Sequence, residues 1–283
     1  MTSPRPQHAA DIDPRHVEAA RSVIIELWQI LASYRKAMVL IGGWVPYLLH
    51  QDARPPHTGS IDVDLLLDPR ELEGDQYARL LELIERHGYR KGDEPFRFVK
   101  EISVGAGQPV SVEVEFLVPR GSLRRRRGHR VPDFRAIEAD GGKLAVRFTE
   151  SCEVGGVMPS GARNTVEVRV PTPEAFLVMK SHALGGRLKE KDAYDIVFCL
   201  RNVPGGADAL ARALAPHRNE AEVQRALAIL SEKFASPEHY GPQAVAAFLD
   251  PADADERAFI ARDAYERVQS LLRALGWGGN GGR

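Results

Sequence analysis

Hydrophobic spacing divides the chain into two halves with different secondary structure. As far as about residue 170, helical patterns are mixed with short apolar runs and with alternating apolar and polar positions, which is typical of an α/β protein. Beyond Pro173, apolar residues recur at helical spacing in each segment between proline or glycine breaks. We therefore predict an α/β (α+β) domain at 13–170, an all-helical domain at 171–275, a disordered tail at 1–12 and a flexible tail at 276–283.

Within the first half, a helix is predicted to begin at Asp13-Pro14, because aspartate suits the N-cap and proline suits the first helical position. A buried strand at 37–43 ends in two glycines, and a second strand covers 60–67. The other expected elements are helices at 44–51 and 71–87, strands at 96–105 and 109–119, and β segments at 143–148 and 165–170. This alternation predicts a mixed sheet accompanied by helices.

The composition is that of an ordinary globular protein, with 43% hydrophobic and 27% charged residues. No apolar run approaches the roughly 18 residues that suggest a membrane span, and the N-terminal segment lacks the apolar core of a secretory signal. The two cysteines, Cys152 and Cys199, are too few for a disulfide framework and lack metal-site spacing. We therefore expect a cytoplasmic protein.

One segment is strongly basic, although the formal net charge of the chain is −1. Between Pro119 and Arg135 there are seven arginines and one acid, Asp133. Four of the arginines are consecutive: Arg124, Arg125, Arg126 and Arg127. The run is either a solvated loop or a surface that binds phosphates, because guanidinium groups bind phosphate oxygens in bidentate fashion.

Two aspartates interrupt the apolar strand at 60–67. Asp62 and Asp64 are two positions apart, so their side chains point to the same face of a strand. They would be unremarkable on a solvent-facing edge, but the apolar run at 65–67 does not alternate, as in a strand that is covered on both faces. Two neighbouring carboxylates repel each other unless a positive charge lies between them. This pattern favours a metal site or a catalytic site.

A later strand offers a third carboxylate. Glu113 and Glu115 lie on one face of the strand at 109–119, and either of them would complete a cluster if this strand pairs beside 61–67. Two divalent ions held roughly 4 Å apart need such a bridging set of acids. Oxygen ligands without a cluster of histidine or cysteine favour Mg²⁺ or Mn²⁺ over zinc.

The glycine pair Gly42-Gly43 stands between a strand and a short helix. Bare backbone N–H groups at such a turn bind anions such as a triphosphate, although a glycine pair alone usually marks only a turn. Its position one loop ahead of the Asp-x-Asp strand makes the nucleotide interpretation stronger. Ser60 shares the face of Asp62, where it either closes the loop or contacts the nucleotide.

Together, the glycine pair, Asp62-Val63-Asp64 and the later acid resemble the nucleotidyltransferase superfamily related to DNA polymerase β. Within it, the chain looks like the AbiEii/AbiGii-type toxins of bacterial toxin–antitoxin systems. Those proteins carry a lysine, an arginine and a Lys-Asp-x-x-Asp element in a helical second half. Here these elements are Lys180, Arg187 and the segment 191–195, and the resemblance covers about residues 38–200.

The resemblance implies a nucleotidyltransferase-like fold and a set of residue roles. Asp62, Asp64 and Glu115 are the implied metal-binding and catalytic residues, with Glu113 as the alternative third acid. The implied nucleotide-binding residues are Gly42, Gly43, Ser60, Lys180, Arg187, Lys189, Lys191 and Asp192, and Asp195 either orients these cations or forms a simple charge pair. Two departures from the usual pattern are the glutamate in the third position and the long spacing from Gly43 to Asp62.

The leading function is transfer of a nucleotide from an NTP to an RNA acceptor, with the tRNA 3′ end as the expected acceptor, the arginines at 124–127 as RNA contacts and an antitoxin as a protein partner. An alternative is transfer to a small hydroxylated molecule such as an aminoglycoside. A third possibility is a degenerate protein that binds without catalysis, but intact acids at Asp62, Asp64 and the later strand argue against it.

Overall fold

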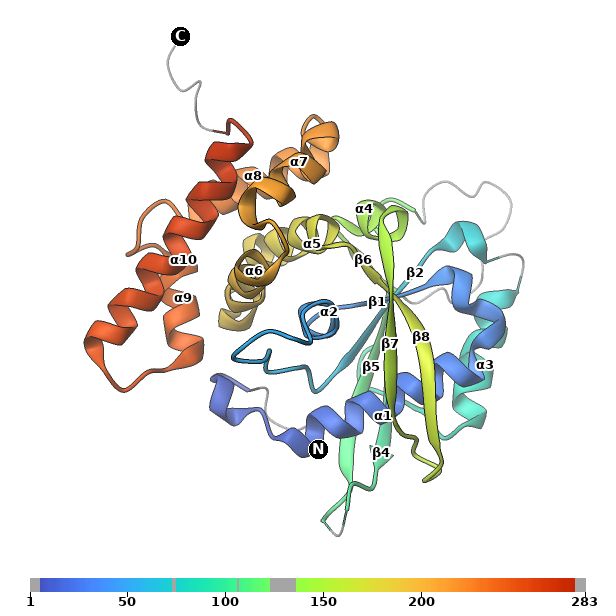
Figure 1. Ribbon diagram of the computed structural model, residues 1–283. Coiled ribbons are helices and arrows are strands. Elements are labelled where there is room, and N and C mark those ends of the chain that lie inside the picture. Colours follow the sequence, from blue (N-terminus) through green and yellow to red (C-terminus); the bar gives the residue numbers. More distant parts are fainter. Residues whose placement is uncertain (1–5, 73–74, 106, 123–135, 278–283) are drawn as a thin grey trace. The chain divides into compact units, whose positions relative to one another are not determined.

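The computed structural model describes residues 6–72, 75–105, 107–122 and 136–277, and the chain forms two compact units (Figure 1). The first unit contains residues 12–48 and 59–172, and the second contains 5–11, 49–58 and 173–283. The segment 49–58 therefore groups with the helices, although it lies between two stretches of the first unit.

A six-stranded mixed sheet forms the centre of the first unit. Its strand order is β1-β2-β5-β4-β3, and β6 pairs with the end of β5. The strands are β1 (Met38–Ile41), β2 (Val63–Leu67), β3 (Arg90–Lys91), β4 (Arg97–Ile102), β5 (Val110–Pro119) and β6 (Ile137–Ala139). Because β2 and β5 are parallel neighbours, the two strands with the candidate acids lie side by side, as the sequence interpretation required.

Helices α1 (Pro14–Ile30), α2 (Trp44–Leu49), α3 (Gln76–Arg86) and α4 (Gly142–Arg147) accompany the sheet. As predicted, Asp13 caps α1, with its side chain accepting a hydrogen bond from the backbone N–H of Arg15. Along β5, the side chains of Val112, Val114 and Phe116 are fully buried, while the glutamates between them are half-buried. The alternation in the sequence is therefore the alternation of a strand with one closed face.

One local prediction for this unit is wrong, and one strand was not predicted. Residues 143–148 were expected to be a β segment, but most of them belong to α4, whose buried face holds Leu144, Ala145 and Val146. Gly141, with φ of 75°, is the N-cap of this helix, and a six-residue segment is too short to separate a helix from a strand by spacing alone. The structure also contains β7 (Thr149–Val157), which pairs antiparallel with β8 (Arg163–Pro171) as a two-stranded sheet.

The second unit is helical, and its main helices run from yellow to red in Figure 1. They are α5 (Pro173–Gly186), α6 (Glu190–Asn202), α7 (Gly206–Leu214), α8 (Ala221–Lys233), α9 (Tyr240–Leu249) and α10 (Ala254–Ala274). A short 3-10 helix, Ala9–Asp11, lies within the tail that was expected to be disordered, and His8 Nδ1 lies 3.0 Å from the carbonyl oxygen of Ala247 in α9. Among the described residues, none of the helices combines the length and apolar character needed to cross a membrane.

Candidate nucleotidyltransferase site

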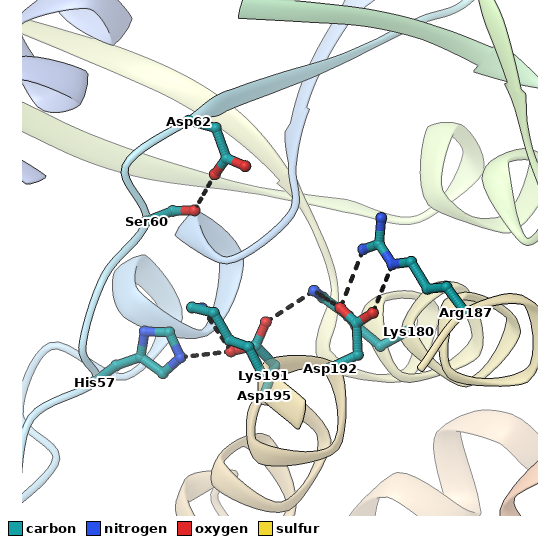
Figure 2. Close-up of polar contacts among 8 residues, drawn as sticks. All are labelled: His57, Ser60, Asp62, Lys180, Arg187, Lys191, Asp192 and Asp195. Atoms are coloured by element: carbon teal, nitrogen blue, oxygen red, sulfur yellow. Dashed lines mark hydrogen bonds and ion pairs between the residues drawn. The ribbon is translucent and has the colours of Figure 1, made fainter. Parts of the chain in front are cut away.

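The two aspartates lie at the beginning of β2. Asp64 belongs to the strand and is flanked by the fully buried Val63 and Leu65, whereas Asp62 immediately precedes the strand. The side chain of Asp62 accepts a hydrogen bond from the hydroxyl of Ser60, as Figure 2 shows, and its carbonyl accepts one from Trp44 Nε1 at 2.9 Å. Both aspartates are half-buried, which suits side chains that contact a ligand.

The glycine turn lies against Asp64. Ile41 at the end of β1 pairs with Asp64, and Gly42 follows with φ of 74°. A Cβ atom at Gly42 would be 2.2 Å from Asp64 Oδ2, so any side chain at this position would have to displace the carboxylate of Asp64. Glycine is therefore required here both by its backbone conformation and by the adjacent carboxylate.

Glu115 lies beside Asp64 on the neighbouring strand. The two residues are register partners in the parallel pairing of β2 and β5, so their side chains leave the sheet on the same face. Arg97 on β4 binds this strand: its Nη2 is 2.6 Å from Glu115 Oε1 and its Nε is 3.3 Å from Glu113 Oε2. The register partner of Asp64 is thus Glu115 rather than Glu113.

In the part of the chain that the structure describes, no three or more His, Cys, Asp or Glu side chains are grouped so that they could hold a metal ion. The Arg97 guanidinium binds the carboxylate of Glu115 through two hydrogen bonds. The roles predicted for Asp62, Asp64 and Glu115 in metal binding remain predictions. The arginines predicted to bind RNA, at 124–127, lie outside the described residues.

The helical unit gathers five of its charged side chains into one network, which Figure 2 shows. Asp192 is fully buried and binds Lys180 at 2.7 Å and Arg187 at 2.8 Å. Asp195 is also fully buried and binds Lys180 at 2.8 Å and Lys191 at 2.9 Å. These residues are Lys180 of α5, Arg187 just after it, and Lys191, Asp192 and Asp195 of α6, so the elements predicted from the sequence do come together.

Burial and charge set the protonation of this network. Burial alone would raise the pKa of Asp192, but Lys180 and Arg187 lower it to about 2. Burial would likewise lower the pKa of Lys180, but the two aspartates raise it above its usual value. With three cations and two carboxylates, the network holds an excess positive charge, and its half-exposed member is Arg187. Lys189 stands at the N-cap of α6 and makes no ion pair with the described residues.

The sequence interpretation missed His57, which joins this network from segment 49–58. Its Nε2 lies 2.9 Å from Asp195 Oδ1, and both side chains are almost completely buried. Burial, reinforced by the charge of Lys191, lowers the pKa of His57 to about 4. No spacing signal marks this residue, because its partner is 138 positions away.

The pKa of His57 predicts an acid-sensitive fold. Between about pH 6.5 and 4 the unfolded chain binds a proton at this imidazole and the folded chain does not. This group therefore leaves the free energy of unfolding unchanged above about pH 6.5 and lowers it as the pH decreases below that value. For this shift the loss approaches about 3 kcal/mol in the free energy of unfolding. Urea unfolding at pH 7, 5.5 and 4.5 measures it. The His57→Phe variant should lose less stability than the wild type over this range, and equal losses in both proteins would contradict the assignment.

Comparison with known proteins places the chain among the nucleotidyl transferases. Residues 27–273 match the family described as "Nucleotidyl transferase AbiEii toxin, Type IV TA system", and because the match spans most of the chain, the protein belongs to this family. A solved structure of an antigenic nucleotidyltransferase-like protein from Paracoccidioides brasiliensis aligns with a TM-score of 0.45 and 22% identity, over 76% of this chain and 88% of that one. Among curated proteins, none matches the chain.

Proposed function

We propose that this protein transfers a nucleotide from an NTP to the end of an RNA acceptor, with tRNA as the expected acceptor, and acts in the cytoplasm as the toxin of a toxin–antitoxin pair. Membership of the AbiEii family supports nucleotidyl transfer as the reaction class. The observation that carries the proposal is the position of Asp64, which lies between the Gly42 turn and its register partner Glu115. Paired acids beside a bare backbone turn suit an anionic substrate with its cation.

The carboxylates at β2 have the donor chemistry that suits Mg²⁺, or Mn²⁺ in its place. Magnesium in phosphate-transfer sites is commonly held by one or two carboxylates together with substrate phosphates. Asp62 and Asp64 would supply these two, with Glu115 as a third when Arg97 releases it. The bound ion would neutralise charge on the phosphate oxygens.

The roles of the other residues follow from this arrangement. In the proposed reaction, an acceptor hydroxyl forms a bond to the α-phosphorus, the bond to pyrophosphate breaks, and Glu115 takes the hydroxyl proton. Ser60 orients the carboxylate of Asp62, to which it donates a hydrogen bond. The backbone N–H groups of Gly42 and Gly43 bind phosphate oxygens.

The helical unit contributes cations in this proposal. Arg187 is the suitable direct contact for a phosphate, because its guanidinium is about half exposed, whereas the ammonium groups of Lys180 and Lys191 are buried against carboxylates. Lys189, which is partly exposed, offers a second contact. Asp192 holds Lys180 and Arg187 together.

The decisive test is incubation of the protein with each α-labelled NTP, magnesium and total RNA, with a parallel reaction that contains aminoglycosides in place of RNA. Label in tRNA supports the proposal, label in the small molecule supports the alternative acceptor, and no labelled RNA contradicts the proposal. Replacing Arg124, Arg125, Arg126 and Arg127 with glutamine tests the RNA contact. If these arginines bind phosphates, the variant should bind RNA more weakly and with a smaller dependence on salt.

Gly42→Ala is expected to lower transfer at least about tenfold, because the new methyl group displaces the carboxylate of Asp64. Positive φ adds a stability cost of about 1 kcal/mol. The matched control is Gly88→Ala, since Gly88 also has positive φ, at 85°, but has open space at its Cβ position. Transfer rates and urea unfolding of both variants separate the effects. Equal transfer rates in the two variants would show that Gly42 matters only to the backbone.

Glu115→Gln is expected to lower transfer by about 100-fold, because it removes the proton acceptor beside Asp64. Glu113→Gln should lower transfer only about threefold or less. The register partner of Glu113 on β4 is Val99, and the ion pair of Glu113 with Arg97 is longer than that of Glu115. Single-turnover rates at saturating NTP and RNA compare the two. The reverse order of effects would assign the third carboxylate to Glu113.

A further inference from the structure

Segment 49–58 carries a buried histidine into the helical unit. The segment follows α2 and leads to β2, yet it clusters with the helices. Most of its residues are exposed or half-buried, but His57 is 5% exposed and its side chain only 1%. A polar side chain that is buried from an exposed loop needs a partner that compensates for lost hydration.

His57 contacts one stretch of α6. Its ring stacks on Tyr194, with centroids 5.2 Å apart and planes at 26°, and meets Phe198 edge-on at 4.8 Å. Asp195, which lies between these two aromatic residues in the sequence of α6, places its Oδ1 atom 2.9 Å from the imidazole Nε2 (Figure 2). The two rings fix the plane of the imidazole, so the direction of its hydrogen bond is set by packing.

The hydrogen bond adds direction without adding charge. The imidazole is neutral above about pH 4, and because an ionised carboxylate only accepts hydrogen bonds, Nε2 carries the proton. Asp195 also binds Lys180 and Lys191, and Lys180 bridges Asp195 to Asp192. A histidine in this place orders the carboxylate and leaves the excess positive charge of the network unchanged.

A continuous path of contacts therefore runs from His57 through Asp195, Lys180 and Asp192 to Arg187. We propose that His57 is a positioning residue for nucleotide binding: it fixes Asp195, and through this path it sets the guanidinium of Arg187 for a phosphate of the NTP. This inference rests on the proposed function of the helical cations. It also accounts for the long spacing between Gly43 and Asp62, because this spacing contains His57, which contacts α6.

Three variants separate the hydrogen bond from the packing. His57→Phe keeps an aromatic ring and removes the donor, while His57→Gln keeps an amide donor near the Nε2 position and removes the ring. The control is His50→Phe. His50 lies on the same segment, and the centroid of its ring is 6.2 Å from that of Phe198. Within the described residues, however, its buried Nε2 has no hydrogen-bond partner.

Equilibrium binding of each NTP with Mg²⁺, without RNA, provides the readout, and thermal melting checks that each variant is folded. We expect His57→Phe to raise the Kd about tenfold, His57→Gln to raise it less than about threefold, and His50→Phe to leave it unchanged. If His57→Phe does not fold, His57→Ala with imidazole in the buffer replaces it, and we expect imidazole to restore binding.

The outcomes distinguish this inference from the proposed function. If the wild type binds no NTP, the proposed function fails and the inference fails with it. If the wild type binds and His57→Phe binds equally well, the positioning role is overturned and the proposed function stands. If His57→Gln binds as weakly as His57→Phe, a hydrogen-bond donor at this position does not restore binding, and the inference is again overturned.

Discussion

Asp64→Asn is expected to abolish nucleotide transfer, with a loss of about a thousandfold or more. The substitution keeps the size of the side chain but removes the negative charge that the proposed Mg²⁺ site needs. It should also leave the fold intact, because asparagine fits beside the Gly42 turn as aspartate does. The transfer of α-labelled NTP to RNA, measured in single-turnover reactions, gives the size of the effect.

The matched control is Asp68→Asn, just beyond the end of β2. Asp68 binds Arg70 at 2.7 Å and caps the 3-10 helix Pro69–Glu71, so its charge serves a local structural role. We expect this variant to retain transfer activity to within about threefold, at a small stability cost. Full activity in Asp64→Asn would remove the central acid from the proposed site, and equal losses in both variants would point to a general effect of charge on this strand.

Asp195→Ala is expected to destabilise the helical unit by about 3–5 kcal/mol, because it leaves the buried ammonium group of Lys191 without its carboxylate and Lys180 with Asp192 in place of two aspartates. The control is Asp263→Ala on α10, which removes ion pairs to Arg201 and Arg267 that are partly exposed. Its expected cost is about 1 kcal/mol or less. Urea unfolding at pH 7 measures both.

Two outcomes of the Asp195 experiment are informative. A loss larger than that of the control supports a network that depends on full charge compensation. Equal losses in the two variants would contradict this view. Lys191 is the member that neutralises with least cost, since burial lowers its pKa. Part of the destabilisation should therefore disappear at high pH.

Local features of the site were predictable from the sequence because they are set by residues close together in the chain. The strand that ends at the glycine pair, the short helix and the apolar strand with Asp64 all lie where hydrophobic spacing put them. Asp62 is an exception, since the strand begins at Val63. A carbonyl that accepts a hydrogen bond from Trp44 instead of joining the ladder explains this boundary, and such a contact is invisible to a period-two pattern.

The parts that were not predictable depend on residues far apart. Arg97 has no spacing signal that links it to Glu115, and only the antiparallel register of β4 and β5 makes them partners. In the hairpin of β7 and β8, the sequence predicts β8 but not β7, because β7 contains charged residues and a glycine pair in place of a clear apolar face. In the helical unit, Lys180, Arg187 and Asp192 were found through family resemblance, which carries no information about the loop histidine.

The route of segment 49–58 also bears on the order of events during synthesis. A ribosome releases the glycine turn, this segment and the Asp-x-Asp strand early, but Asp195 follows His57 by 138 residues. Until α6 is made, the imidazole has no carboxylate to bind, and the aromatic residues that enclose it are also absent. In the nascent first half, segment 49–58 therefore lacks these contacts of His57. They form only when the second half of the protein has emerged from the ribosome.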